Sequence, residues 1–234
     1  MAIKRIIAIG SAKGGVGKSS ITASIALSLS KHTSVGILDA DIYGPNQHIL
    51  FNINKKPKIS KKLFNPINKN KIKIISMGNI LNNDKAAIWR GPMLSGAIKK
   101  LINSTNWGDL DYLLIDMPPG TGDAYLTVAA EIKPDHVLLV TSQSNLAVQD
   151  TIKSKAMFDR LKIPMIGIID NMSYSISPSS DKKIHEFTAI NLEDEIGLKV
   201  LGSVPRTREI GNFNPEKSSI LFEPIYNEIL KIIQ

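Results

Sequence analysis

The stretch Gly10-Ser11-Ala12-Lys13-Gly14-Gly15-Val16-Gly17-Lys18-Ser19-Ser20 decides the fold, because it follows the apolar run Ile6–Ile9 and precedes a segment of helical pattern. A glycine-rich loop between a strand and a helix predicts a phosphate-binding loop. Glycines let the backbone approach an anion closely, and the following helix presents the positive end of its dipole to that anion. The sequence therefore predicts a nucleotide site in which Lys18 reaches the outer phosphates and the Ser19 hydroxyl binds Mg²⁺.

The loop departs from the standard pattern G-x-x-x-x-G-K-[ST] at one position. Ala12 stands where the first glycine is expected, and Lys13 precedes the glycines. This lysine resembles the signature lysine of the deviant P-loop ATPases, the MinD, ParA and Mrp relatives, in which it crosses a dimer interface to the partner's nucleotide. The resemblance implies a homodimer in which Lys13 acts across the interface.

Composition narrows the classes of protein to which the chain can belong. It has 234 residues, which suit one α/β domain over residues 1–234, and it contains no cysteine. The absence of cysteine excludes disulfide bonds, thiolate metal ligands and thiol catalysis. No apolar stretch approaches the ~20 residues of a membrane span, and the apolar N-terminal run is expected to be a strand rather than a signal peptide. We therefore expect a cytoplasmic protein without a transmembrane segment.

The formal charge of +8 comes from one segment. Eight of the 29 basic residues are lysines between Lys55 and Lys73, where no acidic residue occurs, and the other 21 equal the 21 acidic residues in number. Pro57 and Pro66 interrupt this segment, which has neither a strong period nor a high apolar content. We expect a surface excursion near residues 54–71, which is either a solvated loop or a contact surface for an anionic partner.

Apolar runs alternate along the chain with segments of helical pattern. Runs without polar alternation predict parallel strands that are buried on both faces of a sheet. The predicted strands are Ile6–Ile9, Val35–Leu38, Ile72–Ile75, Tyr112–Ile115, Val137–Val140, Met165–Ile169 and Val200–Val204, and the predicted helices are Ser19–Ser30, Met93–Ile102, Ala124–Ile132, Leu146–Leu161 and Lys183–Ile196. This order predicts an α/β fold, a doubly wound and mostly parallel sheet with helices on both faces. Ile220–Ile233 is apolar on one side with Lys231 as its only base, which predicts a packing helix rather than a membrane-surface helix.

Acidic residues follow two of the predicted strands. Asp39 and Asp41 come after the second strand, at the carboxyl edge of a parallel sheet where ligands of such folds bind, and alternation would place them on one side. Near a Mg²⁺-nucleotide, one carboxylate can hold a water of the metal shell while the other orients the attacking water. Asp116 ends the fourth strand as a second metal carboxylate, and the loop 118–122 after it suits a segment whose position reports the γ-phosphate.

Five motifs together resemble the Mrp/ApbC-type iron–sulfur cluster carrier ATPases. They are Lys13-Gly14-Gly15-Val16-Gly17-Lys18-Ser19, Asp39-Ala40-Asp41-Ile42-Tyr43-Gly44-Pro45, Trp89-Arg90-Gly91-Pro92-Met93, Trp107-Gly108-Asp109-Leu110-Asp111-Tyr112 and Asp116-Met117-Pro118-Pro119-Gly120-Thr121-Gly122-Asp123. General P-loop proteins share the first motif, whereas the Tyr-Gly-Pro, Trp-Arg-Gly-Pro-Met and Met-Pro-Pro-Gly-Thr-Gly-Asp pieces are more specific to this branch. The motifs span most of the chain.

The resemblance implies a role for each matching residue. Lys13 would act across the dimer, Asp41 would assist water attack, and Asp39 with Asp116 would lie around Mg²⁺. The phosphates and Mg²⁺ would be cradled by Gly14, Gly15, Val16, Gly17, Lys18, Ser19 and Ser20. By the resemblance, Asn171 matches the family's adenine-recognising position, and an amide can both donate to and accept from adenine. The stretch Arg206-Thr207-Arg208 departs from the apolar and acidic residues usual near the base.

The sequence breaks the resemblance at the cluster ligands. In the family a Cys-Pro-x-Cys pair binds an iron–sulfur cluster between two subunits, whereas Ser177 and Ser180 stand at both cysteine positions here. A serine hydroxyl is a much poorer ligand for such clusters than a thiolate, so we expect direct cluster ligation to be lost. Asp181 and His185 lie nearby without the paired spacing of a metal site. Such serines arise by engineering or in a lineage that has lost the cluster function.

The main hypothesis is a homodimeric, Mg²⁺-dependent ATPase that slowly hydrolyses ATP to ADP and phosphate. By resemblance it acts in iron–sulfur cluster assembly or transfer, with assembly or recipient proteins as partners. The alternative hypothesis is a MinD- or ParA-like positioning ATPase that binds nucleic acid or membrane through the lysine-rich segment. The branch-specific motifs favour the first hypothesis, so nucleic acid is not an expected partner. A third hypothesis, an inactive binding module, requires that Lys18 contributes nothing to nucleotide affinity or turnover.

Overall fold

The computed structural model describes residues 2–80, 92–177, 179–180, 182–185 and 189–233. Within this part of the chain, eight strands form the central sheet, in the order β12 (Val200–Val204), β9 (Met165–Asn171), β8 (His136–Thr141), β1 (Ile3–Gly10), β7 (Leu110–Asp116), β2 (Val35–Asp39), β6 (Ile72–Ser76) and β5 (Ile67–Lys69). Neighbouring strands are parallel except β5, which pairs antiparallel with β6 at the edge. The doubly wound α/β fold predicted from the sequence is confirmed.

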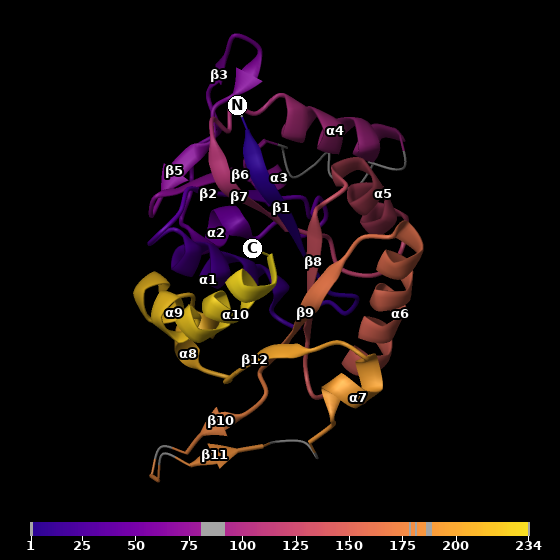
Figure 1. Ribbon diagram of the computed structural model, residues 1–234. Coiled ribbons are helices and arrows are strands. Elements are labelled where there is room, and N and C mark those ends of the chain that lie inside the picture. The colour runs from indigo at the N-terminus through magenta and orange to yellow at the C-terminus, as the bar shows by residue number, and fades with distance from the viewer. Residues whose placement is uncertain (1, 81–91, 178, 181, 186–188, 234) are drawn as a thin grey trace.

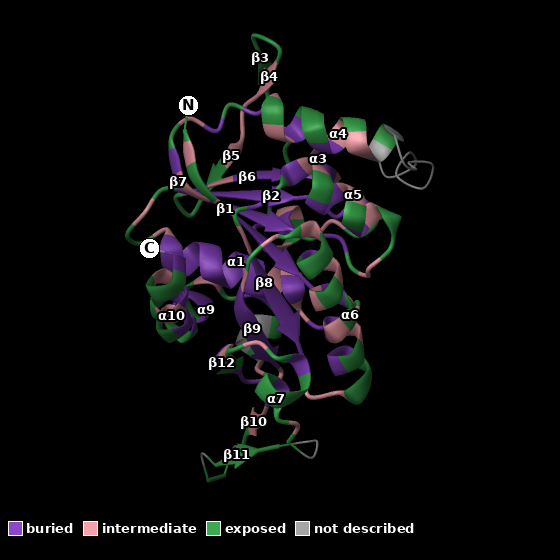
Figure 2. Ribbon diagram, turned by 45° about the vertical axis from the view of Figure 1, so that its right-hand side comes forward, coloured by how far each residue is buried: buried purple, intermediate pink, exposed green. Residues whose placement is uncertain are grey.

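Helices cover both faces of the sheet (Figures 1 and 2). One face carries α1 (Lys18–Leu29), α9 (Pro215–Leu221) and α10 (Glu223–Ile233), and the other carries α4 (Pro92–Asn103), α5 (Asp123–Ile132) and α6 (Asn145–Leu161). Alternation along β1 divides its side chains between two cores, because Ile7 and Ile9 pack with α1 while Ala8 packs with α5. Strands with apolar residues on both sides are thus buried on both faces, as the unbroken apolar runs predict.

The remaining elements are short and lie mostly at the ends of the sheet. They are α2 (Gln47–Leu50), β3 (Ile59–Ser60), β4 (Leu63–Phe64), α3 (Met77–Ile80), β10 (Ser175–Ile176), β11 (Lys183–Ile184), α7 (Leu192–Ile196) and α8 (Arg208–Gly211). β10 and β11 form an antiparallel hairpin that projects from the body at the end opposite β3 (Figure 1). No helix in the described ranges combines the length and the apolar character needed to cross a membrane.

The predicted helix Lys183–Ile196 is wrong over most of its length. Lys183 and Ile184 belong to β11, and the helix α7 begins only at Leu192. Asn191 explains this start, because its side chain accepts a hydrogen bond from the backbone N–H of Asp194 and so caps the helix. The predicted C-terminal packing helix is divided at Phe222 into α9 and α10, and α10 buries its apolar side against the sheet.

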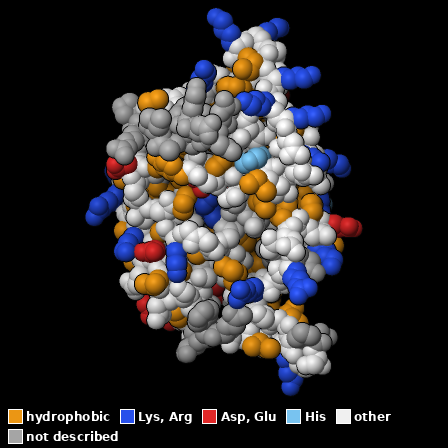
Figure 3. Space-filling view, turned by 180° about the vertical axis from the view of Figure 1, so that it is seen from behind, with side chains coloured by type: hydrophobic (Ala, Val, Ile, Leu, Met, Phe, Trp, Pro, Cys, Tyr) orange, Lys and Arg blue, Asp and Glu red, His pale blue; other side chains and the backbone are white. Residues whose placement is uncertain are grey.

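The lysine-rich excursion lies at the surface as expected, but it contains regular structure. β3 and β4 form a hairpin, and β5 adds a strand to the sheet. The hairpin is held to the body because the backbone of Phe64 pairs with Ser104 and Asn106 beyond α4. Seven of the eight lysines are exposed, and they gather along one edge of the molecule (Figure 3): Lys55, Lys56, Lys58, Lys61, Lys62, Lys69 and Lys71. The eighth, Lys73, is half-buried and donates to the Trp107 carbonyl.

Candidate functional site

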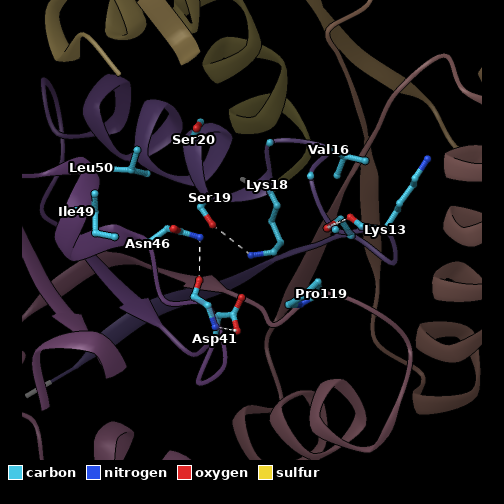
Figure 4. Close-up of a pocket in the computed structure, with 15 residues that line it drawn as sticks. Lys13, Val16, Lys18, Ser19, Ser20, Asp41, Asn46, Ile49, Leu50 and Pro119 are labelled. Atoms are coloured by element: carbon cyan, nitrogen blue, oxygen red, sulfur yellow. Dashed lines mark hydrogen bonds between the residues drawn. The ribbon is translucent and has the colours of Figure 1, made fainter. Parts of the chain in front are cut away.

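The glycine-rich loop lies where the direction of winding changes. β1 is flanked by β7 on one side and β8 on the other, so the loop after Gly10 stands at the switch point at the carboxyl end of the sheet. A cavity of about 450 Å³ opens there (Figure 4), lined by Ser11, Lys13, Gly14, Gly15, Val16, Gly17, Lys18, Ser19, Ser20, Asp41, Gly44, Asn46, Ile49, Leu50 and Pro119. The structure therefore brings all seven predicted phosphate-cradle residues to one hollow.

The loop backbone has the conformation that a phosphate cradle needs. Gly15 has φ +84° and Gly17 has φ +87°, values that residues with a Cβ rarely adopt. Gly17 is also the N-cap of α1, and no side chain caps the helix start. The first N–H groups of a helix have no partner within the helix, so those of α1 are suited to bind an anion. This geometry fits the phosphates of a nucleotide.

Lys18 and Asp116 form a buried ion pair below the loop. Lys18 is 6 % exposed and Asp116 is fully buried, and the ammonium Nζ donates to the carboxylate Oδ1. Lys18 Nζ also lies 3.5 Å from the Ser19 hydroxyl (Figure 4). The other oxygen of Asp116, Oδ2, accepts a hydrogen bond of 2.7 Å from Gln47 Nε2. A phosphate that binds Lys18 therefore competes with Asp116 for the charge of its ammonium.

Asp39 anchors the loop that follows β2. Its Oδ2 accepts from the backbone N–H groups of Asn46 and Gln47, both at 3.0 Å, and from the Ser76 hydroxyl at 2.7 Å. Its Oδ1 accepts from the backbone N–H of Asp41 at 3.2 Å. Asp39 is completely buried beneath the cavity, so its present contacts hold the segment 41–47 in place.

Asp41 has different surroundings from Asp39. Strand β2 ends at Asp39, so the predicted alternation does not extend to Asp41, which lines the cavity and points toward the same space as Lys18 (Figure 4). Its Oδ1 accepts from the backbone N–H groups of Tyr43 and Gly44 at 3.1 and 3.0 Å. Burial raises the pKa of Asp41. The pKa of Asp39 is raised by burial, and by the nearby negative charge of Asp116.

Lys13 lies at the rim of the same cavity but points away from Lys18 (Figure 4). Its Nζ donates to the Ser144 hydroxyl at 3.4 Å. Ser144 is the N-cap of α6 and accepts from the backbone N–H of Ala147. Lys13 thus points toward the start of α6 rather than into the loop that carries it (Figure 4).

A second cavity, of about 190 Å³, adjoins the loop at Gly17 and Ser20. Its lining is Gly17, Ser20, Asn171, Met172, Pro205, Arg206, Thr207 and Gly211. Asn171 is 2 % exposed, and its Nδ2 donates to the Val16 carbonyl at 2.7 Å. Its Oδ1 is buried without a hydrogen-bond partner in the described structure. An unpaired buried acceptor beside a cavity suits a ligand that donates a hydrogen bond, as an adenine amino group does.

Ser177 and Ser180 lie at the tip of the β10–β11 hairpin. The Ser177 hydroxyl lies 3.1 Å from the Ser179 hydroxyl, and the backbone N–H of Ser177 donates to the Lys182 carbonyl at 2.9 Å. The His185 ring is 6.0 Å from that of Tyr174. Among the residues that the structure describes, no group of three or more His, Asp or Glu side chains is arranged to hold a metal ion. Asp181 and the motif residues Trp89, Arg90 and Gly91 lie outside the described ranges.

A comparison with protein families decides the assignment. The model of the ParA group described as NUBPL iron-transfer P-loop NTPase matches residues 2–234. The chain belongs to the NUBPL iron-transfer P-loop NTPase family. This membership agrees with the resemblance to cluster carriers and supports it over the MinD-like alternative.

Relatives of this NUBPL-family chain include two bacterial proteins named iron-sulfur cluster carrier protein. The one from Pseudomonas fragi is 42% identical over 215 residues, covering 89% of this chain and 75% of its own length. The one from Aquifex aeolicus is 39% identical and covers 98% of this chain. The iron-sulfur cluster transfer protein NUBPL of Dictyostelium discoideum is 40% identical over 87% of this chain. The chain spans 65% of the length of the Aquifex and Dictyostelium relatives.

Solved structures agree with the NUBPL-family fold. A nucleotide-binding protein from Archaeoglobus fulgidus, in complex with ADP, is 31% identical with a TM-score of 0.78 and covers 96% of this chain and 89% of that one. The septum site-determining protein MinD from Pyrococcus horikoshii, complexed with Mg-ADP, is 19% identical with a TM-score of 0.73 over 96% and 95% of the chains. At that identity the MinD structure shows a shared fold.

Sequence reasoning on this NUBPL-family chain missed Gln47 and Ser76. Both are buried, and both bond the carboxylates that sequence reasoning found. Ser76 ends β6 beside Asp39, a register that only the sheet pairing reveals. One feature of the sequence could have pointed to Gln47: it directly follows the turn Tyr43-Gly44-Pro45-Asn46, which comes after Asp39 and Asp41.

Proposed function

We propose that this chain is a Mg²⁺-dependent ATPase, works as a homodimer and acts in iron–sulfur cluster assembly or transfer without ligating the cluster through Ser177 and Ser180. The observation that carries the nucleotide chemistry is the cavity in which the glycine-rich loop, Lys18 and Asp41 converge. Membership of the iron-transfer family supports the role in cluster transfer, as does the similarity to relatives named as iron-sulfur cluster carrier and transfer proteins.

The chain's own residues divide the work on ATP. The backbone of residues 14–20 and the ammonium of Lys18 bind the phosphates, since the start of α1 has N–H groups to donate. Asp41 orients the attacking water, because it is the carboxylate that lines the phosphate cavity. Phosphoryl transfer depends mainly on positioning and on charge stabilisation, so this task does not require a strong base. Slow turnover agrees with such a site.

The residues around Lys18 fit a magnesium ion. Mg²⁺ in nucleotide sites usually takes one or two carboxylates or hydroxyls together with phosphate oxygens and waters. Ser19 and Asp116 would hold it, with Asp39 behind them. When bound, the ion would neutralise charge that develops on the phosphates. Asp39 would add negative charge near the ion from the neighbouring strand β2, where it stands in register with Asp116.

Asn171 would recognise the base. Its Nδ2 is occupied by the Val16 carbonyl, which leaves the buried Oδ1 to accept from the amino group of adenine. Arg206 and Thr207 line the same cavity although they depart from the family pattern. A neutral base can lie against these side chains, because Pro205 beside them supplies an apolar surface.

The dimer is supported by Lys13. Its side chain points away from its own phosphate cradle (Figure 4), which agrees with a lysine that serves the nucleotide of a second copy. The cluster itself is a cargo that hydroxyl groups hold poorly, because the hydroxyl is a harder and less acidic ligand than a thiol. A chain without cysteine therefore acts on cluster transfer through its partners and its nucleotide state.

The experiment measures phosphate release and cluster uptake on the same preparations. Phosphate release from ATP should require Mg²⁺ and fall at least tenfold in Asp41→Asn, while the ADP dissociation constant stays within about threefold. Anaerobic reconstitution with iron and sulfide should load a Ser177→Cys/Ser180→Cys protein and leave the parent without a stoichiometric cluster. Absence of Mg²⁺-dependent phosphate release from the parent would refute the ATPase proposal, and a stoichiometric cluster on the parent would refute the loss of ligation.

A further inference from the structure

Gln47 is a buried residue that bonds both the carboxylates Asp39 and Asp116 and the first turn of α1. It opens α2, directly after the loop that carries Asp41, and it is completely buried. Its amide Nε2 donates to Asp116 Oδ2 at 2.7 Å and to the Ser19 carbonyl at 3.0 Å. Its backbone N–H donates to Asp39 Oδ2 at 3.0 Å. One residue thus joins the ends of β2 and β7 to the first turn of α1.

Both N–H groups of the Gln47 amide donate hydrogen bonds, to Asp116 and to the Ser19 carbonyl. Filling space does not explain why a polar side chain stands at this buried position. The carbonyl Oε1 is buried without a hydrogen-bond partner in the described structure, which lowers stability. An apolar side chain of similar size would fill the same space without burying an unpaired carbonyl. The amide is therefore explained by the two hydrogen bonds that it donates.

Asp116 is held between two side chains, Lys18 on Oδ1 and Gln47 on Oδ2. In the function proposed above, the phosphates attract the Lys18 ammonium and weaken its contact with Asp116. Of these two contacts, the one from Gln47 does not compete with a phosphate, because Gln47 is completely buried and does not line the phosphate cavity. The orientation of Asp116 then depends on Gln47.

We propose that Gln47 is a positioning residue that keeps Asp116 aimed at the Ser19 side of the site when Lys18 binds phosphate. This inference rests on the proposed function, since it assigns Gln47 a part in binding Mg²⁺ with the nucleotide. Groups that orient carboxylate and imidazole ligands typically contribute 10- to 100-fold to metal affinity. Gln47 acts through Asp116, and through the Ser19 carbonyl it fixes the distance between α1 and β7.

The test measures the dissociation constant of ADP by calorimetry, once with Mg²⁺ and once with EDTA, so that the ratio gives the gain in affinity due to the ion. In Gln47→Met, which keeps the unbranched shape but has no donor, this gain should fall by about 10- to 100-fold. The affinity in EDTA should stay within about twofold of the parent, because neither lost bond touches the phosphate loop N–H groups.

Asn79→Leu is the matched control for losing a buried amide. Asn79 is 8 % exposed, and its Nδ2 donates to the Lys55 carbonyl at 3.0 Å, away from the carboxylates. This variant should keep the full Mg²⁺-dependent gain even if its thermal unfolding temperature falls. A second arm places Gln47→Met in an Asp116→Asn background, where it should change the gain by less than about twofold, because residues in one network have non-additive effects.

The outcomes separate this inference from the proposed function. A full Mg²⁺-dependent gain in Gln47→Met, or an equal loss of ADP affinity with and without Mg²⁺, overturns the positioning role. An undiminished effect of Gln47→Met in the Asp116→Asn background does so too. If the parent protein binds no ADP, the proposed function itself fails. Should Gln47→Met not fold, Gln47→Asn, which keeps the amide but shortens its reach by one methylene, enters the same measurements with the same expected loss.

Discussion

Replacing Lys18 should destabilise the protein before any nucleotide is added. Lys18 and Asp116 are 6 % and 0 % exposed and form a direct ion pair. Removing one member of a buried pair leaves the other charge uncompensated, at a cost of about 3–5 kcal/mol. Lys18→Met keeps most of the apolar stem, so packing changes little and about 3 kcal/mol is expected. At about 2–4 °C per kcal/mol for a chain of this size, the unfolding temperature should fall by about 6–12 °C.

The assay is urea unfolding without nucleotide, followed by circular dichroism, on the parent and three variants. A Lys18→Met/Asp116→Asn protein should regain most of the stability and lie within about 1 kcal/mol of the parent, since no buried charge is left unpaired. Lys199→Met is the control, because Lys199 pairs with Glu228 at 3.0 Å on the surface, where such pairs contribute about 0–1 kcal/mol.

Two results would refute this reasoning. One is a Lys18→Met protein within about 0.5 kcal/mol of the parent, which would mean that the pair is not formed or is fully solvated in solution. The other is a double variant no more stable than Lys18→Met. If the prediction holds, the loss of hydrolysis in a Lys18 variant must be measured under conditions in which the variant is folded.

Two further predictions concern the glycine-rich loop and Asp111, near the amino end of the central strand β7. Gly17→Ala should lower ADP affinity at least tenfold and stability by about 1–3 kcal/mol, because φ is +87° and a Cβ would overlap the Asn171 amide; Gly14→Ala, whose Cβ would meet nothing within 4 Å, should lose less stability. Calorimetry and urea unfolding measure both, and equal stability losses in the two variants would contradict the geometry. Hydrogen bonds from Lys4 and Ser34 hold the pKa of Asp111 well below its usual range. The contribution of Asp111 to the free energy of unfolding is therefore complete above about pH 4 and is lost as the pH falls further. The parent should lose more unfolding free energy than Asp111→Asn between pH 5 and pH 2. Parallel curves of unfolding free energy against pH for the two proteins would contradict this prediction.

The sequence predicts most of this fold because long apolar runs leave few choices. All seven predicted strands occur, since β-rich runs without polar alternation can be buried on both faces of a parallel sheet. The errors lie where structure depends on distant pairing. β10 and β11 are two residues each and are defined by each other, and β5 is a strand because β6 lies beside it. The sequence pattern predicts a helix from residue 183, but the helix begins only at Leu192, after the capping side chain of Asn191.

The site was predictable in its residue types and less so in its connections. The loop and Asp41 line one cavity and Asn171 lines the adjoining one. Their position after strands predicted the loop and Asp41, whereas Asn171 was predicted from the family resemblance. Sequence spacing does not show which oxygen bonds which donor, so the anchoring of Asp39 by Ser76 and the contact of Gln47 with Asp116 were beyond its reach. Strand order decides these contacts, because β2, β6 and β7 are neighbours in the sheet but not in the chain.

The carboxylates at the end of the sheet have two separate tasks. Asp39 uses its oxygens on backbone N–H groups and Ser76, which fixes the loop that carries Asp41. Asp116 instead bonds side chains, Lys18 and Gln47, one of which a phosphate can draw away. The affinity for nucleotide therefore depends on how much more strongly Lys18 interacts with a phosphate than with Asp116, and not on the strength of one contact alone. A site built in this way keeps its shape through Asp39 while its charge pairing changes at Asp116.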